Sequence, residues 1–303
     1  MLSRIWRWLK VWRRLRLGPI SLLYRFDRRV RVTKGLRVTR QSVFPSKEAS
    51  IRTQRRTISQ TSSDDLPDPR PLAVLVGVGP GFGYELARQL AAEGFDLVLV
   101  CRNAASLTPL VEQANDLGVS AEAFGADATD EVGIDQLFSH IASSHACPSL
   151  VVYSVQYFSP GLATEVEVPA FEAAWRHNCL GAFLVGRRAA RAMEARGKGT
   201  IIFVGSTSSV IGRAEHLNLA VGKFGQRAIS QVFARELWSQ GIHVAHVIID
   251  ADVQEDDDAT TEYPQSKPQD IVHSILHLHS QPMSAWTSEM DLRPWNERFW
   301  EHC

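Results

Sequence analysis

The stretch of this chain best suited to binding a phosphate holds glycines at alternate positions: Gly77, Gly79, Gly81 and Gly83. They follow an apolar run at 72–76 and precede a segment with helical periodicity. Gly77 permits a tight turn, Gly81 lets the backbone approach a pyrophosphate without a Cβ, and Gly83 lets the helix pack close to the strand. Free backbone N–H groups and the positive end of the helix dipole favour a bound phosphate. A strand, a glycine-rich turn and a helix in this order predict a dinucleotide site.

A second feature indicates which dinucleotide fits. The next apolar run, 96–100, is followed by Cys101 and Arg102. An acidic side chain at this point would bind the ribose 2′-hydroxyl of NAD, whereas a guanidinium can pair with the 2′-phosphate of NADP. The arginine and the missing acid therefore favour NADP. The alternative is that Arg102 is a solvated residue at the start of a helix.

The elements that must position these residues follow from the hydrophobic pattern. From Leu72 onward, apolar runs alternate with helical stretches, which predicts a parallel sheet covered by helices on both faces. We therefore expect a single α/β domain with a Rossmann-type doubly wound sheet, and a ligand along the carboxyl edge of the strands. Strands are expected at 72–76, 96–100, 120–125, 150–154, 200–205, 242–249 and 289–292.

The glycine spacing, Gly-x-x-x-Gly-x-Gly, resembles that of the short-chain dehydrogenase/reductase family, with Val76 where that family usually has threonine. The resemblance spans about Leu72 to Trp295. It implies that Asp127 contacts adenine, although Asp127 or Asp130 could instead cap a helix. The cofactor contacts that it implies in this chain are made by Gly77, Gly81, Phe82, Gly83, Arg102, Asp127, Ser154, Lys223 and Val253.

The resemblance also implies three catalytic residues: Ser206, Lys223 and Asn178. In the family, the serine holds the substrate oxygen and the asparagine supports a water chain for protons. The lysine binds the nicotinamide ribose and lowers the pKa of a tyrosine that transfers the proton. That tyrosine position holds Leu219 here, and the family's Asn-Asn-Ala-Gly motif is replaced by residues 153–156, Tyr-Ser-Val-Gln.

Two functions are compatible with this pattern. One is an NADP-dependent oxidoreductase acting on an unidentified carbonyl or alcohol, which the retained serine, lysine and asparagine favour. The other is an NADP-binding pseudoenzyme that serves as a sensor, scaffold or regulatory partner, which Leu219 favours because general acid catalysis typically supplies about 10²–10⁴ in rate. His216 and Tyr157 are candidates to replace the missing acid, and for each the alternative is a position on the rim of the site.

The first 58 residues form a basic extension. Residues 1–70 hold 18 Lys and Arg against 5 Asp and Glu, and the remainder is acidic, with 15 against 28. An arginine-rich, acid-poor and amphipathic segment is typical of a mitochondrial transit peptide. The alternatives are a disordered extension or early start codon, and an amphipathic membrane anchor. We assign 1–58 to this extension, 59–71 to a linker and 72–303 to the Rossmann domain.

Other partners follow from composition and from the resemblance. The four cysteines are far apart in sequence and form no C-x-x-C pair, so neither a disulfide framework nor a structural zinc site is expected. The histidines at 273, 277 and 279 are expected on a solvated face, and no metal site is predicted. We expect a small-molecule substrate, no nucleic-acid partner, a homo-oligomer as in the family, and contact of the amino-terminal segment with a membrane or import receptor.

Overall fold

The computed structural model describes residues 70–254 and 264–298. The basic extension at 1–58, most of the linker at 59–71 and most of the segment 256–265 lie outside the described residues. Within the described part, no helix combines the length and apolar character needed to cross a bilayer.

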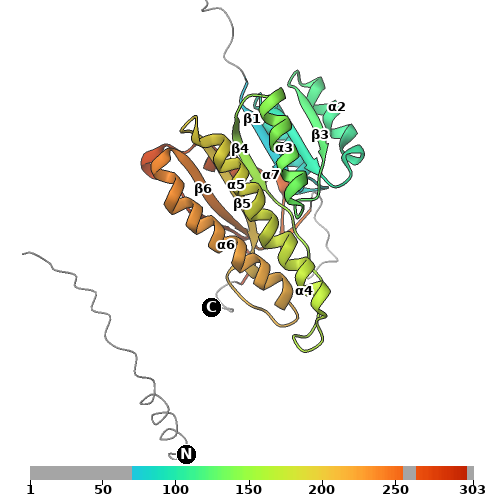
Figure 1. Cartoon of the computed structure of the whole chain (residues 1–303). Coiled ribbons are helices and arrows are strands. Elements are labelled where there is room, and N and C mark those ends of the chain that lie inside the picture. Colours follow the sequence, from blue (N-terminus) through green and yellow to red (C-terminus); the bar gives the residue numbers. More distant parts are fainter. Residues whose placement is uncertain (1–69, 255–263, 299–303) are drawn as a thin grey trace, which may run out of the picture. The chain divides into compact units, whose positions relative to one another are not determined.

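Seven parallel strands form one sheet in the order β3-β2-β1-β4-β5-β6-β9, as Figure 1 shows for its central part. This is the strand order of a doubly wound dinucleotide-binding fold, extended by one strand. The predicted fold is confirmed, and every predicted strand is present with ends within two residues of the expected ones. The strands are β1 Leu72–Val76, β2 Asp96–Cys101, β3 Ala121–Gly125, β4 Pro148–Tyr153, β5 Gly199–Ser206, β6 Ile242–Ile249 and β9 Glu289–Leu292.

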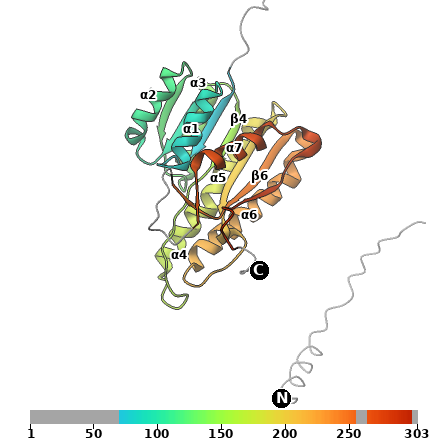
Figure 2. The ribbon, with the colours of Figure 1, turned by 180° about the vertical axis from the view of Figure 1, so that it is seen from behind.

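Helices cover both faces of the sheet. Helices α3, α5 and α6 pack on one face (Figure 1), and α1, α2 and α7 pack on the other, which Figure 2 shows from behind. A short parallel pair, β7 Asp252–Val253 with β8 Gln265–Ser266, was not predicted. The helices are α1 Phe82–Ala92, α2 Thr108–Asp116, α3 Glu131–Ser144, α4 Val168–Trp175, α5 Gly181–Glu194, α6 Leu217–Leu237 and α7 Pro268–Ser280.

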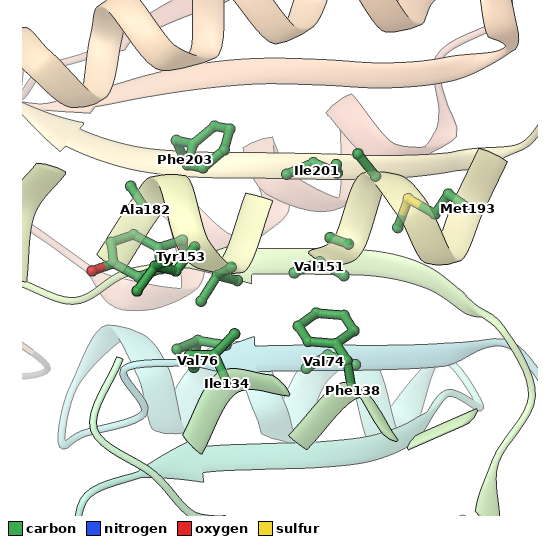
Figure 3. Packing of buried hydrophobic residues seen from close by; sticks show 14 of the residues in the cluster. Val74, Val76, Ile134, Phe138, Val151, Tyr153, Ala182, Met193, Ile201 and Phe203 are labelled. Atoms are coloured by element: carbon green, nitrogen blue, oxygen red, sulfur yellow. The ribbon is translucent and has the colours of Figure 1, made fainter. Parts of the chain in front are cut away.

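The core on the α3–α5–α6 face consists of side chains that alternate along the central strands (Figure 3). Val74 and Val76 of β1 are buried, as are Ile201 and Phe203 of β5. Side chains of α3 and α5, including Phe138, lie over them (Figure 3). Because strands of a parallel sheet are buried on both faces, they are apolar at nearly every position, and this is why the apolar runs located them so closely.

Two histidines shielded from solvent, the buried His246 and the partly buried His279, make the stability of this fold sensitive to acid. Burial lowers the pKa of His246, on β6, to about 4 despite the nearby Glu289 carboxylate, and the Lys223 and Arg227 charges act in the same direction as burial. Burial also lowers the pKa of His279, on α7, to about 4, where its Nδ1 lies 2.9 Å from the Thr200 hydroxyl. Both rings are therefore neutral in the folded protein at pH 7.

We expect the free energy of unfolding to fall as the pH drops from about 6.5 toward 4. The unfolded chain binds protons at its histidines near pH 6.5, whereas the folded chain does so only near pH 4, so acid favours unfolding across this window. Each histidine contributes at most about 1.4 kcal/mol per pH unit. Urea titrations at pH 7, 6 and 5 should show this loss, and the slope should be shallower for His279→Gln. An unchanged slope in that variant would rule out His279 as a contributor.

Candidate functional site

The strand order reverses between β1 and β4, and a cleft of about 350 Å³ opens at the carboxyl ends of the strands there. Ligands in open α/β sheets bind at such a reversal because the two neighbouring connections leave in opposite directions. The cleft is lined by the ends of β1, β2 and β4 and by the segment after β3. Its residues are Val76, Gly77, Val78, Val100, Cys101, Arg102, Ala126, Ala128, Ser154, Val155, Gln156, Tyr157 and His177.

The glycine turn has the backbone geometry that its sequence predicts. Gly77 and Gly81 have positive φ angles of 96° and 73°, which only glycine adopts at no steric cost. Gly81 is the N-cap of α1, so α1 points its amino end toward the turn. A Cβ on Gly83 would lie 3.2 Å from the Val78 Cα, which accounts for the close packing of this helix. Strand β7 lies beside the same turn, because a Cβ built on Gly81 would be 3.5 Å from the carbonyl oxygen of Val253.

Replacing Gly77 with alanine is expected to destabilise the domain. A Cβ there would lie 2.7 Å from the Val155 amide nitrogen and 2.8 Å from its Cγ2, in addition to the strain of the positive φ. Clash and strain together predict a loss of about 2–4 kcal/mol. Gly79→Ala is the matched control, because a Cβ at Gly79 meets nothing within 4 Å. Thermal melts of both variants test this, and equal melting temperatures would contradict it.

Arg102 lines the cleft, and Asp127 lies between two lining residues, Ala126 and Ala128, where the Arg102 charge acts on its carboxyl. Arg102 follows the end of β2, is exposed and lines the cleft. Asp127 accepts a hydrogen bond from the Thr129 amide at 2.8 Å. Burial opposes ionisation of Asp127, but the Thr129 hydrogen bonds and the His177 and Arg102 charges outweigh it and lower the pKa of this carboxyl. The N-cap of α3 is Asp130, which accepts from two helix amides, so Asp127 is not the helix cap.

Ser154 joins the glycine turn to the end of β4. Its amide donates to the Val76 carbonyl at 2.9 Å, and its hydroxyl lies 3.3 Å from that oxygen and 3.2 Å from the Gly77 oxygen. The side chain thus braces the floor of the cleft where the family resemblance places an asparagine.

Asn178 lies in a π-helical turn, Arg176–Leu180, between α4 and α5. Such turns often occur at functional sites. Its amide nitrogen donates to the carbonyls of Tyr157 at 2.8 Å and Ala174 at 2.9 Å, and its oxygen accepts from the Tyr157 amide at 3.3 Å. The side chain therefore fixes the segment after β4 on the cleft, and its own hydrogen-bonding groups are engaged within the protein.

Ser206 and Lys223 meet at the carboxyl end of β5. The Lys223 ammonium donates to the Val204 carbonyl at 2.9 Å, and burial lowers the pKa of Lys223 to about 7. Ser206 and Ser209 form a capping box, in which the Ser206 amide donates to the Ser209 hydroxyl at 3.2 Å and the Ser206 hydroxyl oxygen accepts from the Ser209 amide. The end of β5 thus carries a hydroxyl that can donate to a substrate oxygen, and an amine whose charge changes near neutral pH.

A family model described as short chain dehydrogenase matches residues 71–257, which include the glycine turn, the cleft and both polar groups at the end of β5. The chain belongs to the short-chain dehydrogenase family. A crystal structure of a short-chain dehydrogenase from Rhodopseudomonas palustris is 34% identical to it, covers 74% of this chain and 99% of its own, and has a TM-score of 0.66.

Curated members of the short-chain dehydrogenase family are similar over shorter spans. Sorbitol-6-phosphate 2-dehydrogenase of Escherichia coli is 29% identical over 59% of this chain and 70% of its own length. The 2,3-dihydro-2,3-dihydroxybenzoate dehydrogenase of Bacillus subtilis is 28% identical over 55% of this chain and 64% of its own. A metagenomic short-chain oxidoreductase crystallised with NADP shares the fold at 22% identity, with a TM-score of 0.66 and coverage of 75% and 98% of the two chains.

The remaining predicted positions are Leu219 and the two candidates to replace the missing acid, His216 and Tyr157. Leu219 is buried in its first turns, one turn before Lys223. His216 is the N-cap of α6 and stacks on Phe158 with ring centroids 4.7 Å apart. Tyr157 lines the cleft and stacks on His177 at 5.3 Å.

Sequence reasoning missed the cluster of polar side chains next to Lys223, formed by His246, Glu289 and Arg227. His246 Nδ1 lies 3.3 Å from Glu289 Oε2, and Arg227 holds the same carboxylate with two bonds of 2.6 and 2.7 Å. The Arg227 hydrogen bonds are the main reason that the pKa of Glu289 is lowered. His246 sits two residues after Val244 in β6, so strand alternation would have placed it on the α6 face.

Proposed function

We propose that this chain binds NADP and acts as a reductase or dehydrogenase on an unidentified carbonyl or alcohol. The observation that carries the cofactor choice is Arg102, which lines the cleft just beyond β2, where an NAD-binding chain would present an acid. A guanidinium there suits the 2′-phosphate, and the glycine turn at the amino end of α1 suits the pyrophosphate. The fold neighbour crystallised with NADP supports the same choice.

The groups at the end of β5 support chemistry on the substrate oxygen. Bound NADP would supply the hydride carrier. The Ser206 hydroxyl lies at the end of β5, where its oxygen accepts from the Ser209 amide and its proton is left to donate to a substrate oxygen. Lys223 reaches the same strand end, with a pKa lowered to about 7 by burial. In this proposal Ser206 holds the substrate oxygen, and Lys223 binds ribose hydroxyls and provides charge near the reacting atoms.

The second candidate is an NADP-binding protein without useful hydride transfer. Leu219 supports it, because this buried side chain stands where the family resemblance places the proton-transferring tyrosine and has no proton to give. Val155 and Gln156 support it as well, because both line the cleft and are bulkier than the alanine and glycine of the family motif.

Two measurements on the full chain separate these functions. The first follows NADPH oxidation in the presence of a panel of aldehydes and ketones, and NADP reduction with the matching alcohols. The second is the thermal shift with NADP and with NAD. Turnover together with a shift supports the enzyme. A shift without turnover supports the binding protein, and a larger shift with NAD than with NADP contradicts the cofactor assignment.

We also propose that the chain forms a homo-oligomer through α5 and α6. Several large apolar side chains of these helices are exposed, and apolar groups gathered on neighbouring helices are typical of subunit interfaces. Light scattering of the purified chain tests this, and a monomer at micromolar concentration would contradict it. The exposed side chains are Phe183, Leu217, Val221, Phe224 and Val232.

A mitochondrial location is proposed from composition alone. Residues 1–58 carry the basic, acid-poor pattern of an import signal. Import into isolated mitochondria with cleavage before the Rossmann domain would support it. Equal import of a chain that lacks residues 1–58 would overturn it.

A further inference from the structure

Three potential metal ligands converge at the edge of the sheet opposite β9. Glu122 of β3 faces α3, and His140 of α3 and His145 at the carboxyl end of that helix point toward it. The Nε2 atoms of the two histidines lie 2.7 and 2.9 Å from the same oxygen, Glu122 Oε1. One ligand atom from each of the three side chains falls within 4.8 Å of the others. Two imidazoles and one carboxylate oxygen thus surround a single point.

The backbone and neighbouring side chains hold these three groups in place. The His140 ring packs against Phe124, two residues after Glu122 on the same strand, with ring centroids 5.6 Å apart. The His145 amide donates to the Ile141 carbonyl at 2.9 Å as the C-cap of α3. His145 is mostly buried, with 14% of its side chain exposed, whereas Glu122 and His140 are about a third exposed. An ion can therefore reach the group from solvent without any opening of the fold.

We propose that Glu122, His140 and His145 form a Zn²⁺ site. Zinc prefers imidazole nitrogen and carboxylate oxygen at about 2.0–2.2 Å, which in a tetrahedron puts neighbouring ligand atoms about 3.4 Å apart. The present separations of 2.7 and 2.9 Å need only a small outward movement of the side chains. On binding zinc, each imidazole must adopt the tautomer that carries its proton on Nδ1. The Nε2 lone pairs then bind the ion, and the two hydrogen bonds from Nε2 to the Glu122 carboxylate are lost. Water from the exposed side fills the fourth position.

The site lies away from the nucleotide cleft. Glu122 is near the amino end of β3, and His145 leads into the amino end of β4, whereas the cleft is at the carboxyl ends of the strands. Bound zinc would join the edge strand β3 to the end of α3. We therefore assign it a stabilising role that is independent of the cofactor.

The test is calorimetric titration of the full chain with ZnCl₂, together with thermal melts. We expect one strong site, and a melting temperature raised by about 5 °C at a Zn²⁺ concentration a hundredfold above Kd. Glu122→Gln and His145→Ala should each weaken zinc binding by at least tenfold. Both variants should first show a wild-type circular dichroism spectrum and cooperative melting without metal, since the amide oxygen introduced by Glu122→Gln would still accept a hydrogen bond from His140.

Two controls distinguish the proposed site from other side chains that could bind zinc. His273 and His277 are exposed one turn apart on α7 and could chelate an ion by themselves, so the double variant His273→Ala/His277→Ala is the matched control and should keep full affinity. Co²⁺ substitution should give a visible spectrum without the thiolate charge-transfer band that cysteine ligands produce. Zinc binding that is unchanged in both Glu122→Gln and His145→Ala, or that is lost in the double control, would overturn the proposal, as would the absence of binding.

Discussion

Replacing Leu219 with tyrosine is expected to raise carbonyl reduction by this chain by about 10²–10⁴-fold, the usual contribution of a general acid. Residue 219 is one turn before Lys223 on α6, so both side chains lie on the same face of the helix. Ser206 and Lys223 are already in place at the end of β5, and the variant supplies a hydroxyl that can transfer a proton between them and the substrate. The measurement is kcat for NADPH oxidation with a small ketone, compared with wild type.

Leu219→Phe is the control for this variant, because it adds the ring without the hydroxyl. Both aromatic side chains must replace a buried leucine, so any cost of packing should appear equally in the melting temperatures of the two variants. The Phe variant should show no gain in kcat. Equal rates for the Tyr and Phe variants, with both folded, would mean that a missing proton donor at this position does not limit the reaction.

Arg102→Ala is expected to weaken NADP binding by about 10–100-fold and to change NAD binding less than threefold. A hydrogen bond between a guanidinium and a phosphate contributes roughly 1.5–3 kcal/mol, and only NADP carries the phosphate that Arg102 would contact. Because Arg102 is exposed at the cleft, its removal should leave the fold unchanged. Calorimetric titration of wild type and variant with each dinucleotide measures both affinities.

Two further variants test the geometry of this contact. Arg102→Lys keeps the charge but loses the planar fork, so NADP affinity should fall between those of wild type and the alanine variant. Arg235→Ala removes an equally exposed arginine on α6, whose guanidinium donates to the Gln231 carbonyl, and should leave both affinities unchanged. An equal loss of NADP and NAD affinity in Arg102→Ala would show that the arginine stabilises the cleft for both dinucleotides and does not discriminate the 2′-phosphate of NADP.

The fold was predictable because its strands are buried on both faces. The run 72–76 is continuous in apolar residues, the run 242–249 is apolar apart from His243 and His246, and both match β1 and β6 residue for residue. The positive φ angles of Gly77 and Gly81 were likewise implied by glycine at those positions. The strands and the glycine conformations depend on local sequence, so they can be predicted from one amino-acid sequence.

Contacts between distant residues could not be predicted in this way. The side-chain amide of Asn178 bonds the backbone of Tyr157, 21 positions away, a contact that no motif spacing indicates. Glu122 lies 18 and 23 positions from His140 and His145, so no motif spacing joins them. Val155 lies against Gly77, a contact that depends on the register between β1 and β4.

The most direct test of this account is calorimetric titration of the purified full chain with NADP and, separately, with NAD. We predict one site for each dinucleotide and tighter binding of NADP. The glycine turn can bind the pyrophosphate of both dinucleotides, whereas Arg102 can pair only with the 2′-phosphate of NADP. Absence of heat and of any thermal shift with either dinucleotide would contradict the account, since the enzyme and the binding protein both require an occupied cleft.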